Sequence, residues 1–289
     1  MRSKVVLLVV AAVFVGVGLV VFFAIPRAGN QPETTPLAPE TSGAVDVILT
    51  VDSIDAASGS MRMRLLAAPG EHLPPDGALL LTSVGQIPSI GVAPNRLNQE
   101  QGATVLFQQG DVVDYPFETY KATIQLLALQ GTDPNVAQNT TRPRLAIAGV
   151  FATNAAGFSI TPQSHIGKDD VASVNFVIRR TLGTRGWVLA MMAIYWALAL
   201  GAAAVTALVI TRRRMWETRL LAWLGAVVFA LVSFRTAAPG SPPVGTFFDY
   251  TSVFEAVGIV AISLVVLIVF YITQSPEMLN LAPPRNDRR

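Results

Sequence analysis

The chain has 289 residues, of which 52% are hydrophobic and 14% are charged. Soluble globular proteins carry about 25% charged residues, so this composition indicates a membrane protein. The chain contains no cysteine, which excludes disulfides, zinc–thiolate sites, iron–sulfur clusters and thiol nucleophiles. Its pI is about 9.1, yet residues 27–180 carry ten Lys/Arg against fourteen Asp/Glu. The basic surplus therefore flanks apolar segments, which is typical of membrane topology and not of nucleic-acid binding.

The first predicted element is an apolar run from Val5 to Ile25, with two basic residues before it and a proline after it. Its length of about 20 residues suits a membrane span, whereas the apolar core of a signal peptide has about 7–15 residues. We therefore expect an uncleaved anchor over residues 1–26, with a cleaved signal peptide as the alternative. Residues 27–43, rich in Pro, Thr, Gly and Glu, are predicted to form an extended linker.

Residues 44–182 are predicted to form an extracytoplasmic β-domain. Apolar and polar residues alternate with period two, which is typical of half-buried strands. Turn-rich segments separate these runs. Seven or eight short antiparallel strands over this length favour a β-sandwich. The alternating runs are 45–52, 61–66, 120–128 and 174–179, and further strand-like runs are 78–84, 103–109, 144–152 and 157–160.

Three further apolar segments, at about 187–210, 219–235 and 250–272, predict a three-helix transmembrane bundle within residues 183–274. Residues 275–289 are expected to form a cytoplasmic tail. The predicted fold class is an α+β membrane protein. It has four transmembrane helices and an extracytoplasmic antiparallel β-sandwich inserted between helices 1 and 2.

The basic residues beside the apolar segments predict the orientation. With the N-terminus in the cytoplasm, nine Lys/Arg flank the segments on the inner side and five on the outer side. The positive-inside rule then predicts a multi-pass protein of the cytoplasmic (inner) membrane, with both termini in the cytoplasm and the β-domain outside. The inner residues are Arg2, Lys4, Arg212, Arg213, Arg214, Arg219, Arg285, Arg288 and Arg289; the outer residues are Arg27, Arg179, Arg180, Arg185 and Arg235.

The segment Arg235–Tyr250 joins two of the apolar runs and cannot itself be helical. Proline and glycine prevent either helix from continuing through it. Arg235 and Asp249 stand where the helices should meet the membrane interface, and Glu255 lies about 9 Å further along the last helix. We expect Arg235 to pair with Asp249 or Glu255; contact with another subunit or a lipid headgroup is the alternative. The prolines and glycines are Pro239, Gly240, Pro242, Pro243 and Gly245.

The most distinctive string of the predicted β-domain includes Tyr115, Pro116, Phe117, Glu118 and Tyr120. The proline cannot donate a hydrogen bond to a sheet, so it belongs at a strand entry or edge. The rings offer area for a sandwich core. We interpret the string as a structural corner that fixes strand register, and the alternative is a recognition corner for a partner or the membrane surface.

No set of residues predicts catalysis. The two histidines, His72 and His165, lie in turn-rich segments, and the chain has neither a glycine-rich phosphate loop nor a nucleophile elbow. We therefore predict no catalytic, cofactor-binding or metal-binding residue. The enzyme hypothesis requires a reactive cluster that the sequence does not reveal.

Two strings together carry a family resemblance. They are Y-P-F-[D/E]-x-Y at Tyr115–Tyr120 and P-G-x-P-P-x-G-x-x-x-D-[Y/W] at Pro239–Tyr250. In this order they resemble an uncharacterised actinobacterial family of four-span membrane proteins with an outer β-domain. The chain is also similar to LucB-like accessory subunits of mycobacterial Mce lipid-import complexes. It departs from the expected pattern at Glu118, where Asp is expected, and at Glu255, where an aromatic residue is expected.

The resemblance implies a non-enzymatic accessory subunit that associates with, and stabilises or regulates, a lipid or fatty-acid import complex of the cell envelope. Its partners would be membrane lipids and the subunits of a multi-protein lipid transporter, with no nucleic acid. The alternative is a lipid-binding or sensor membrane protein that uses its outer β-domain, whose core would then need a cavity.

Overall fold

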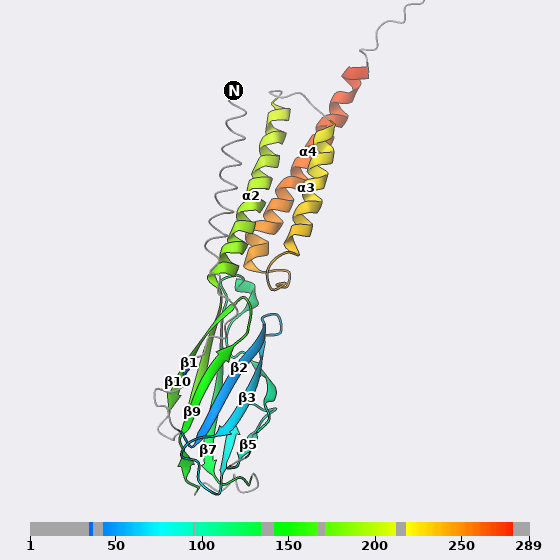
Figure 1. The fold of residues 1–289 in the computed structure, drawn as a ribbon. Helices are drawn as coiled ribbons and strands as arrows, with labels where there is room; N and C mark the ends of the chain where they lie inside the picture. The colour runs from blue at the N-terminus through cyan, green and yellow to red at the C-terminus, as the bar shows by residue number, and fades with distance from the viewer. Residues whose placement is uncertain are drawn as a thin grey trace, which may run out of the picture. The chain divides into compact units, whose positions relative to one another are not determined.

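The computed structural model describes residues 35–36, 43–94, 96, 98–133, 142–166, 171–211 and 218–279. The chain divides into two compact units, residues 1–186 and 187–289 (Figure 1). The first contains two β-sheets and the second contains helices. The apolar run Val5–Ile25, which was predicted to be an anchor, lies outside the described residues.

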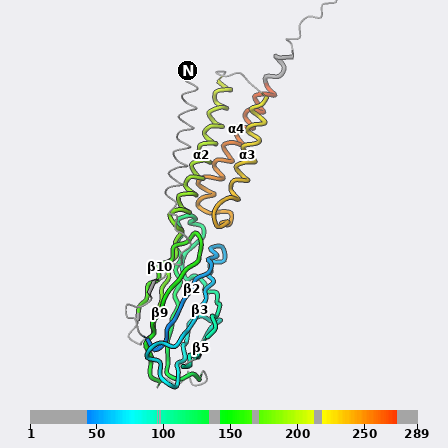
Figure 2. Tube along the Cα trace, viewed as in Figure 1, coloured from blue at the N-terminus to red at the C-terminus, as the bar shows by residue number. Residues whose placement is uncertain are grey.

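The first sheet has five strands in the order β1-β9-β2-β3-β6. β9, β2 and β3 lie side by side (Figure 2). The long strands β2 and β3 form a hairpin whose register shifts between Val51 and Ser53. Such a shift increases the local twist of a strand pair. The strands are β1 (Thr35–Pro36), β2 (Val45–Asp55), β3 (Ser60–Pro69), β6 (Gln101–Leu106) and β9 (Ile147–Thr153).

The second sheet follows the order β10-β11-β7-β4-β5, with β8 paired to β7. Its pairs are all antiparallel among the described residues. A short helix, η1 (Val112–Asp114), precedes β7. The strands are β4 (Ala78–Thr82), β5 (Ser89–Val92), β7 (Thr119–Gln130), β8 (Arg144–Leu145), β10 (Phe158–Ile166) and β11 (Ala172–Arg180).

The alternating faces of both sheets meet in one hydrophobic core. On β2, the side chains of Val45, Val47, Leu49 and Val51 are fully buried, and β3, β7 and β11 show the same alternation. Residues of both sheets belong to one buried cluster. The ring of Phe151 on β9 lies 5.5 Å, centroid to centroid, from that of Phe176 on β11. The first unit is therefore sandwich-like, with two sheets packed face to face.

The expected antiparallel pairing is wrong for one central pair, because β2 and β9 run parallel. The chain passes through the second sheet between these two strands, so no hairpin turn fixes their relative direction. Alternation of side chains is the same in parallel and antiparallel strands. The sequence pattern therefore located the strands without determining this pairing.

The second unit contains α2 (Leu182–Ile210, which begins in the first unit), α3 (Arg219–Arg235), the π-helical turn η3 (Asp249–Val253) and α4 (Phe254–Leu279). The Tyr195 hydroxyl on α2 donates a hydrogen bond of 2.8 Å to the Leu231 carbonyl on α3. The Trp196 indole N–H donates one of 3.0 Å to the Thr251 carbonyl on η3. The middle of α2 thus lies level with the end of α3 and with η3. Figure 1 shows that α3 runs antiparallel to α2.

The predicted fold class, four transmembrane helices with a β-domain inserted between the first two, is wrong. Within the described ranges, two helical segments are long and apolar enough to cross a membrane, Leu182–Ile210 and Asp249–Thr273. α3 has 17 residues, short of the ~20 that a span needs. An arginine stands at each end of α3, and the prolines that follow prevent its extension. The described structure is a large two-sheet region followed by two apolar helices and this shorter one.

Candidate functional site

The hairpin between α3 and η3 takes its shape from its prolines and glycines. α3 ends at Arg235, and Pro239, Pro242 and Pro243 lie in the non-helical segment that follows. Gly240 has φ 76° and Gly245 has φ 99°, both in the region that favours glycine. The chain therefore turns back within a few residues and brings Arg235 opposite the start of the next helix.

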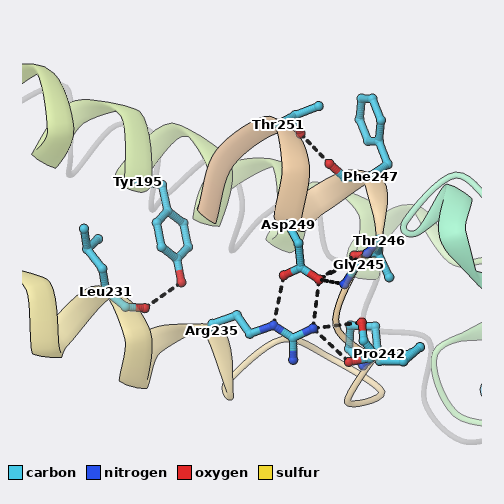
Figure 3. A network of polar contacts seen from close by, with 10 residues as sticks. Tyr195, Leu231, Arg235, Pro242, Gly245, Thr246, Phe247, Asp249 and Thr251 are labelled. Carbon is cyan, nitrogen blue, oxygen red and sulfur yellow. Dashed lines mark hydrogen bonds and ion pairs between the residues drawn. The ribbon is translucent and has the colours of Figure 1, made fainter. Parts of the chain in front are cut away.

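Arg235 and Asp249 form an ion pair at the centre of this hairpin (Figure 3). Arg235 donates from Nε to Asp249 Oδ1 at 2.9 Å and from Nη2 to Oδ2 at 3.0 Å. Nη2 also donates to the carbonyls of Pro242 and Pro243, at 3.1 and 2.9 Å. The Asp249 side chain is fully buried and that of Arg235 is 18% exposed. The planar guanidinium thus connects a carboxylate and two loop carbonyls, a geometry that lysine does not provide.

The Asp249 carboxylate also caps the helix that it begins. Asp249 stands three residues after Thr246, the spacing of a capping box. Its Oδ2 accepts hydrogen bonds from the backbone N–H groups of Gly245 and Thr246, at 2.9 and 3.2 Å, and from the Thr246 hydroxyl at 3.2 Å. The backbone N–H of Asp249 in turn donates to the Thr246 carbonyl. One carboxylate therefore binds the end of α3, the loop and the first helical turn after it.

Aromatic side chains around Tyr195 of α2 complete this end of the helical unit. The Tyr195 ring lies 5.8 Å from that of Phe234 on α3 and 5.9 Å from that of Phe248 beside Asp249, centroid to centroid. Tyr195 and Phe248 are fully buried. Because η3 is a π turn, in which the Phe254 N–H donates to the Asp249 carbonyl, the usual i→i+4 bonding is interrupted there. The ion pair, the π turn and the Tyr195 ring together form the hairpin joint.

Glu255 takes no part in the hairpin joint. Its side chain is exposed on α4, and within the described part of the chain it makes neither an ion pair nor a hydrogen bond. Of the two pairings expected from the sequence, the structure therefore contains Arg235 with Asp249 and not Arg235 with Glu255.

The string around Tyr115 forms the entry to β7 in the first unit. Pro116 lies between η1 and β7, and its peptide bond with Tyr115 is cis. Tyr115, Glu118 and Tyr120 are buried, whereas Phe117 is about half exposed at 47%. Burial raises the pKa of the Tyr120 phenol, and the nearby negative charge of Glu118 raises it further. Pro116 is buried as well, so four of the five predicted residues face the interior.

A buried ion pair, which the sequence interpretation missed, neutralises Glu118. Arg180 donates from Nε to Glu118 Oε1 at 2.7 Å, and the two side chains are 3% and 0% exposed. The guanidinium carbon lies 4.1 Å from the centroid of the Phe158 ring and 5.2 Å from that of Tyr115, distances typical of cation–π contacts. Glu118 Oε2 and the Tyr120 hydroxyl have no hydrogen-bond partner among the described residues.

A signal for this pair was present in the strand pattern. Along β11 every second side chain from Val174 to Ile178 faces the core, and Arg180 is the next in this series. Glu118 lies two residues before the buried Tyr120, so it falls on the same face at the entry to β7. Period two therefore places both charges on the core face. The sequence interpretation counted Arg180 only as a charge flanking an apolar segment.

Each cluster pairs its buried carboxylate with an arginine of the same chain. The Asp249 carboxylate accepts five hydrogen bonds from its own chain. No group of three or more His, Asp or Glu side chains that could hold a metal ion occurs in the described ranges. The hydrogen bonds of Arg235 and Asp249 connect the end of α3, the loop and the start of the next helix.

Comparison with known families matches the two parts of the chain separately. Residues 35–178 match a family model described as a domain of unknown function, DUF4436. Residues 180–274 match a second such model, DUF8686. No curated protein matches the chain, so the resemblance to Mce accessory subunits remains a prediction. The boundary between the two matches falls at the end of β11, directly before α2.

Replacing Arg235 tests the hairpin joint. Arg235→Ala leaves the buried Asp249 carboxylate without its cation, and we expect the free energy of unfolding to fall by about 3 kcal/mol. Arg235→Lys should recover only part of this loss, because an ammonium cannot form the forked contact. Thermal unfolding of the full chain in mild detergent measures both. Arg219→Ala, at the exposed opposite end of α3, is the matched control, and equal melting of Arg235→Ala and this control would contradict the prediction.

The Arg180–Glu118 pair is tested by a double substitution. Arg180→Met leaves a buried carboxylate without a counter-charge, and we expect a loss of about 3–5 kcal/mol. Adding Glu118→Leu removes that charge and should restore most of the stability. Unfolding followed by circular dichroism at a β-sheet wavelength measures the effect. A double variant no more stable than Arg180→Met would show that packing of the arginine stem, and not its charge, is what matters.

Proposed function

We propose that this protein is a non-catalytic integral-membrane subunit that stabilises or regulates an assembly importing lipids or fatty acids across a cell envelope. The observation that carries the membrane part is the surface of the two apolar helices. Only 28% of the most apolar window of each helix is buried within the chain. So much exposed apolar surface requires lipid or a partner.

The two buried ion pairs support a role in assembly rather than in catalysis. Catalytic groups usually lie in clefts, with perturbed acid–base properties and access to substrate. Here Glu118 and Asp249 are each fully buried against an arginine of the same chain. Such groups fix the geometry of a protein that acts by contact. The lipid-import part of the proposal rests on the resemblance of the two sequence strings.

The charges beside α2 support an orientation. Arg212, Arg213, Arg214 and Arg219 follow the helix, whereas Arg179 and Arg185 lie at its start and Arg180 is engaged with Glu118. Under the positive-inside rule, the C-terminal end of α2 then faces the cytoplasm and the β-sheets face the outside.

The alternative, a β-domain that carries an apolar ligand in its core, receives less support. Side chains from both sheets form one buried cluster, and the rings of Phe151 and Phe176 bridge the sheets at 5.5 Å. A ligand between the sheets would have to displace this contact. We therefore favour the assembly role.

Purification of the tagged full chain from its own organism tests the function. In mild detergent, we expect it to retain other membrane proteins in near-stoichiometric amounts, and an unrelated tagged membrane protein serves as control. Deletion of the gene should lower uptake of a labelled fatty acid, and the wild-type gene should restore it. A protein that always elutes alone would refute the assembly role. Stable partners with unchanged uptake would refute only the lipid-import part.

A cysteine probe tests the orientation, since the chain has no cysteine of its own. Ala57 is exposed in the turn between β2 and β3. We expect Ala57→Cys to react with a membrane-impermeant maleimide in intact cells, while the wild type stays unlabelled. Labelling that occurs only after the membrane is permeabilised would place the sheets in the cytoplasm.

A further inference from the structure

The most exposed large side chains of α4 lie along one line. Ile262 is 65% exposed, Val265 58%, Val269 54% and Ile272 64%. Among the described side chains of α4, they are the large hydrophobic ones that are more than half exposed. Their spacings of three, four and three residues follow the seam along which two helices pack in a left-handed coiled coil.

Two further residues extend this line towards η3 with the same spacing. Gly258 lies four residues before Ile262, and Glu255 lies three residues before Gly258. A Cβ built on Gly258 would meet no atom within 4 Å, and the Glu255 side chain is exposed. We call this line the Glu255 stripe: Glu255, Gly258, Ile262, Val265, Val269 and Ile272.

The Glu255 stripe lies away from the contacts that α4 makes within the chain. Among the described side chains of α4, the buried ones are Ala256, Val260, Ser263 and Leu267, spaced four, three and four residues apart. At about 100° per residue, this buried line and the Glu255 stripe lie on different faces of the helix. Among the described residues nothing covers the stripe, so it is available to a partner without rearrangement of the described helices.

Lipid alone does not account for the composition of the Glu255 stripe. Acyl chains solvate isoleucine and valine well, but they offer no counter-charge to a carboxylate. Glu255 directly precedes the uncharged run 256–273 and lies about 9 Å along the helix from Asp249. The cation in the hairpin joint, Arg235, is already bonded to Asp249 and two carbonyls.

A second copy of this chain is also a poor occupant. Copies inserted in the same orientation and packed along this stripe would bring the two Glu255 carboxylates to the same level. Like charges so placed repel each other, which disfavours the pair. Within the described residues no cation of this chain pairs with Glu255, so the charge favours a cation from a different polypeptide.

We infer that the Glu255 stripe docks a transmembrane helix of another subunit that carries an arginine or lysine at the level of Glu255. Gly258 allows the two backbones to approach closely, and the β-branched residues below it form the apolar seam. The ion pair at one end fixes the depth of the partner helix. This inference rests on the proposed assembly role and specifies the chemistry of the partner.

Photo-crosslinking in living cells tests the inference with the full chain. Ile262 is replaced by p-benzoylphenylalanine, and irradiation is expected to yield an adduct with a different membrane protein. Mass spectrometry then identifies the crosslinked helix, which should carry Arg or Lys at the level of Glu255. Glu255→Lys should lower the yield of adduct and the recovery of that partner about tenfold or more, because like charges would then meet.

Two controls separate docking from folding. Gly258→Ile should also reduce partner recovery, because the added side chain keeps the helices apart. Gly225→Ile on α3 is its match, since Gly225 likewise has open space around a built Cβ, and it should leave recovery unchanged. Unaltered melting of the Glu255→Lys and Gly258→Ile chains, each purified without the partner and compared with the partner-free wild type, would show that the chain itself remains folded. Exchange of the partner's basic residue for glutamate should restore binding to Glu255→Lys.

The possible results distinguish this inference from the proposed function. Partner recovery that is unchanged in both Glu255→Lys and Gly258→Ile overturns the docking surface and leaves the assembly role intact. Adducts with lipid only, with a second copy of this chain, or with a helix lacking Arg and Lys also overturn the docking surface. If the wild-type chain retains no partner, both proposals fail.

Discussion

The helical unit depends on the ion pair between Arg235 and Asp249. The hairpin between α3 and η3 contains three prolines, so it cannot form a regular set of backbone hydrogen bonds. In an apolar environment, each unbonded backbone group costs several kcal/mol. The guanidinium binds two of the loop carbonyls, while the carboxylate binds two backbone N–H groups. One charge pair thus replaces the missing backbone bonds and fixes where α3 ends and the next helix begins.

The Arg180–Glu118 pair in the first unit is bonded differently. Its guanidinium lies against the rings of Phe158 and Tyr115, and one oxygen of Glu118 has no protein partner in the described part of the chain. A buried pair of this kind adds little net stability, because desolvation offsets most of its attraction. Loss of either partner is nevertheless costly. The pair therefore constrains how β11 and the entry to β7 meet, at the end of the unit where the chain continues into α2.

The sequence predicted local structure better than the fold. Period two located β2, β3, β7 and β11, and the prolines and charges of the hairpin predicted the bond between Arg235 and Asp249. The predicted apolar segment 219–235 coincides with α3, and the error lay in counting its 17 residues as a membrane span. Composition could not show that β2 and β9 run parallel, because that pairing depends on contacts distant in sequence. Arg180 and Glu118 stand at positions where the alternation of side chains along the strands predicts burial. The sequence interpretation instead treated Arg180 as a charge flanking a membrane segment. For these two residues, the alternation of side chains along the strand predicted burial better than charge did.

The three carboxylates Glu118, Asp249 and Glu255 differ in where their counter-charge comes from. The first two are buried, and each is paired with an arginine of its own chain. Glu255 is exposed beside an uncharged helical run and has no such partner among the described residues. A cation supplied by another subunit would interact with Glu255 only in the assembled state. Because a ligand that binds only the folded form stabilises it by mass action, such a contact would couple the stability of this subunit to its assembly.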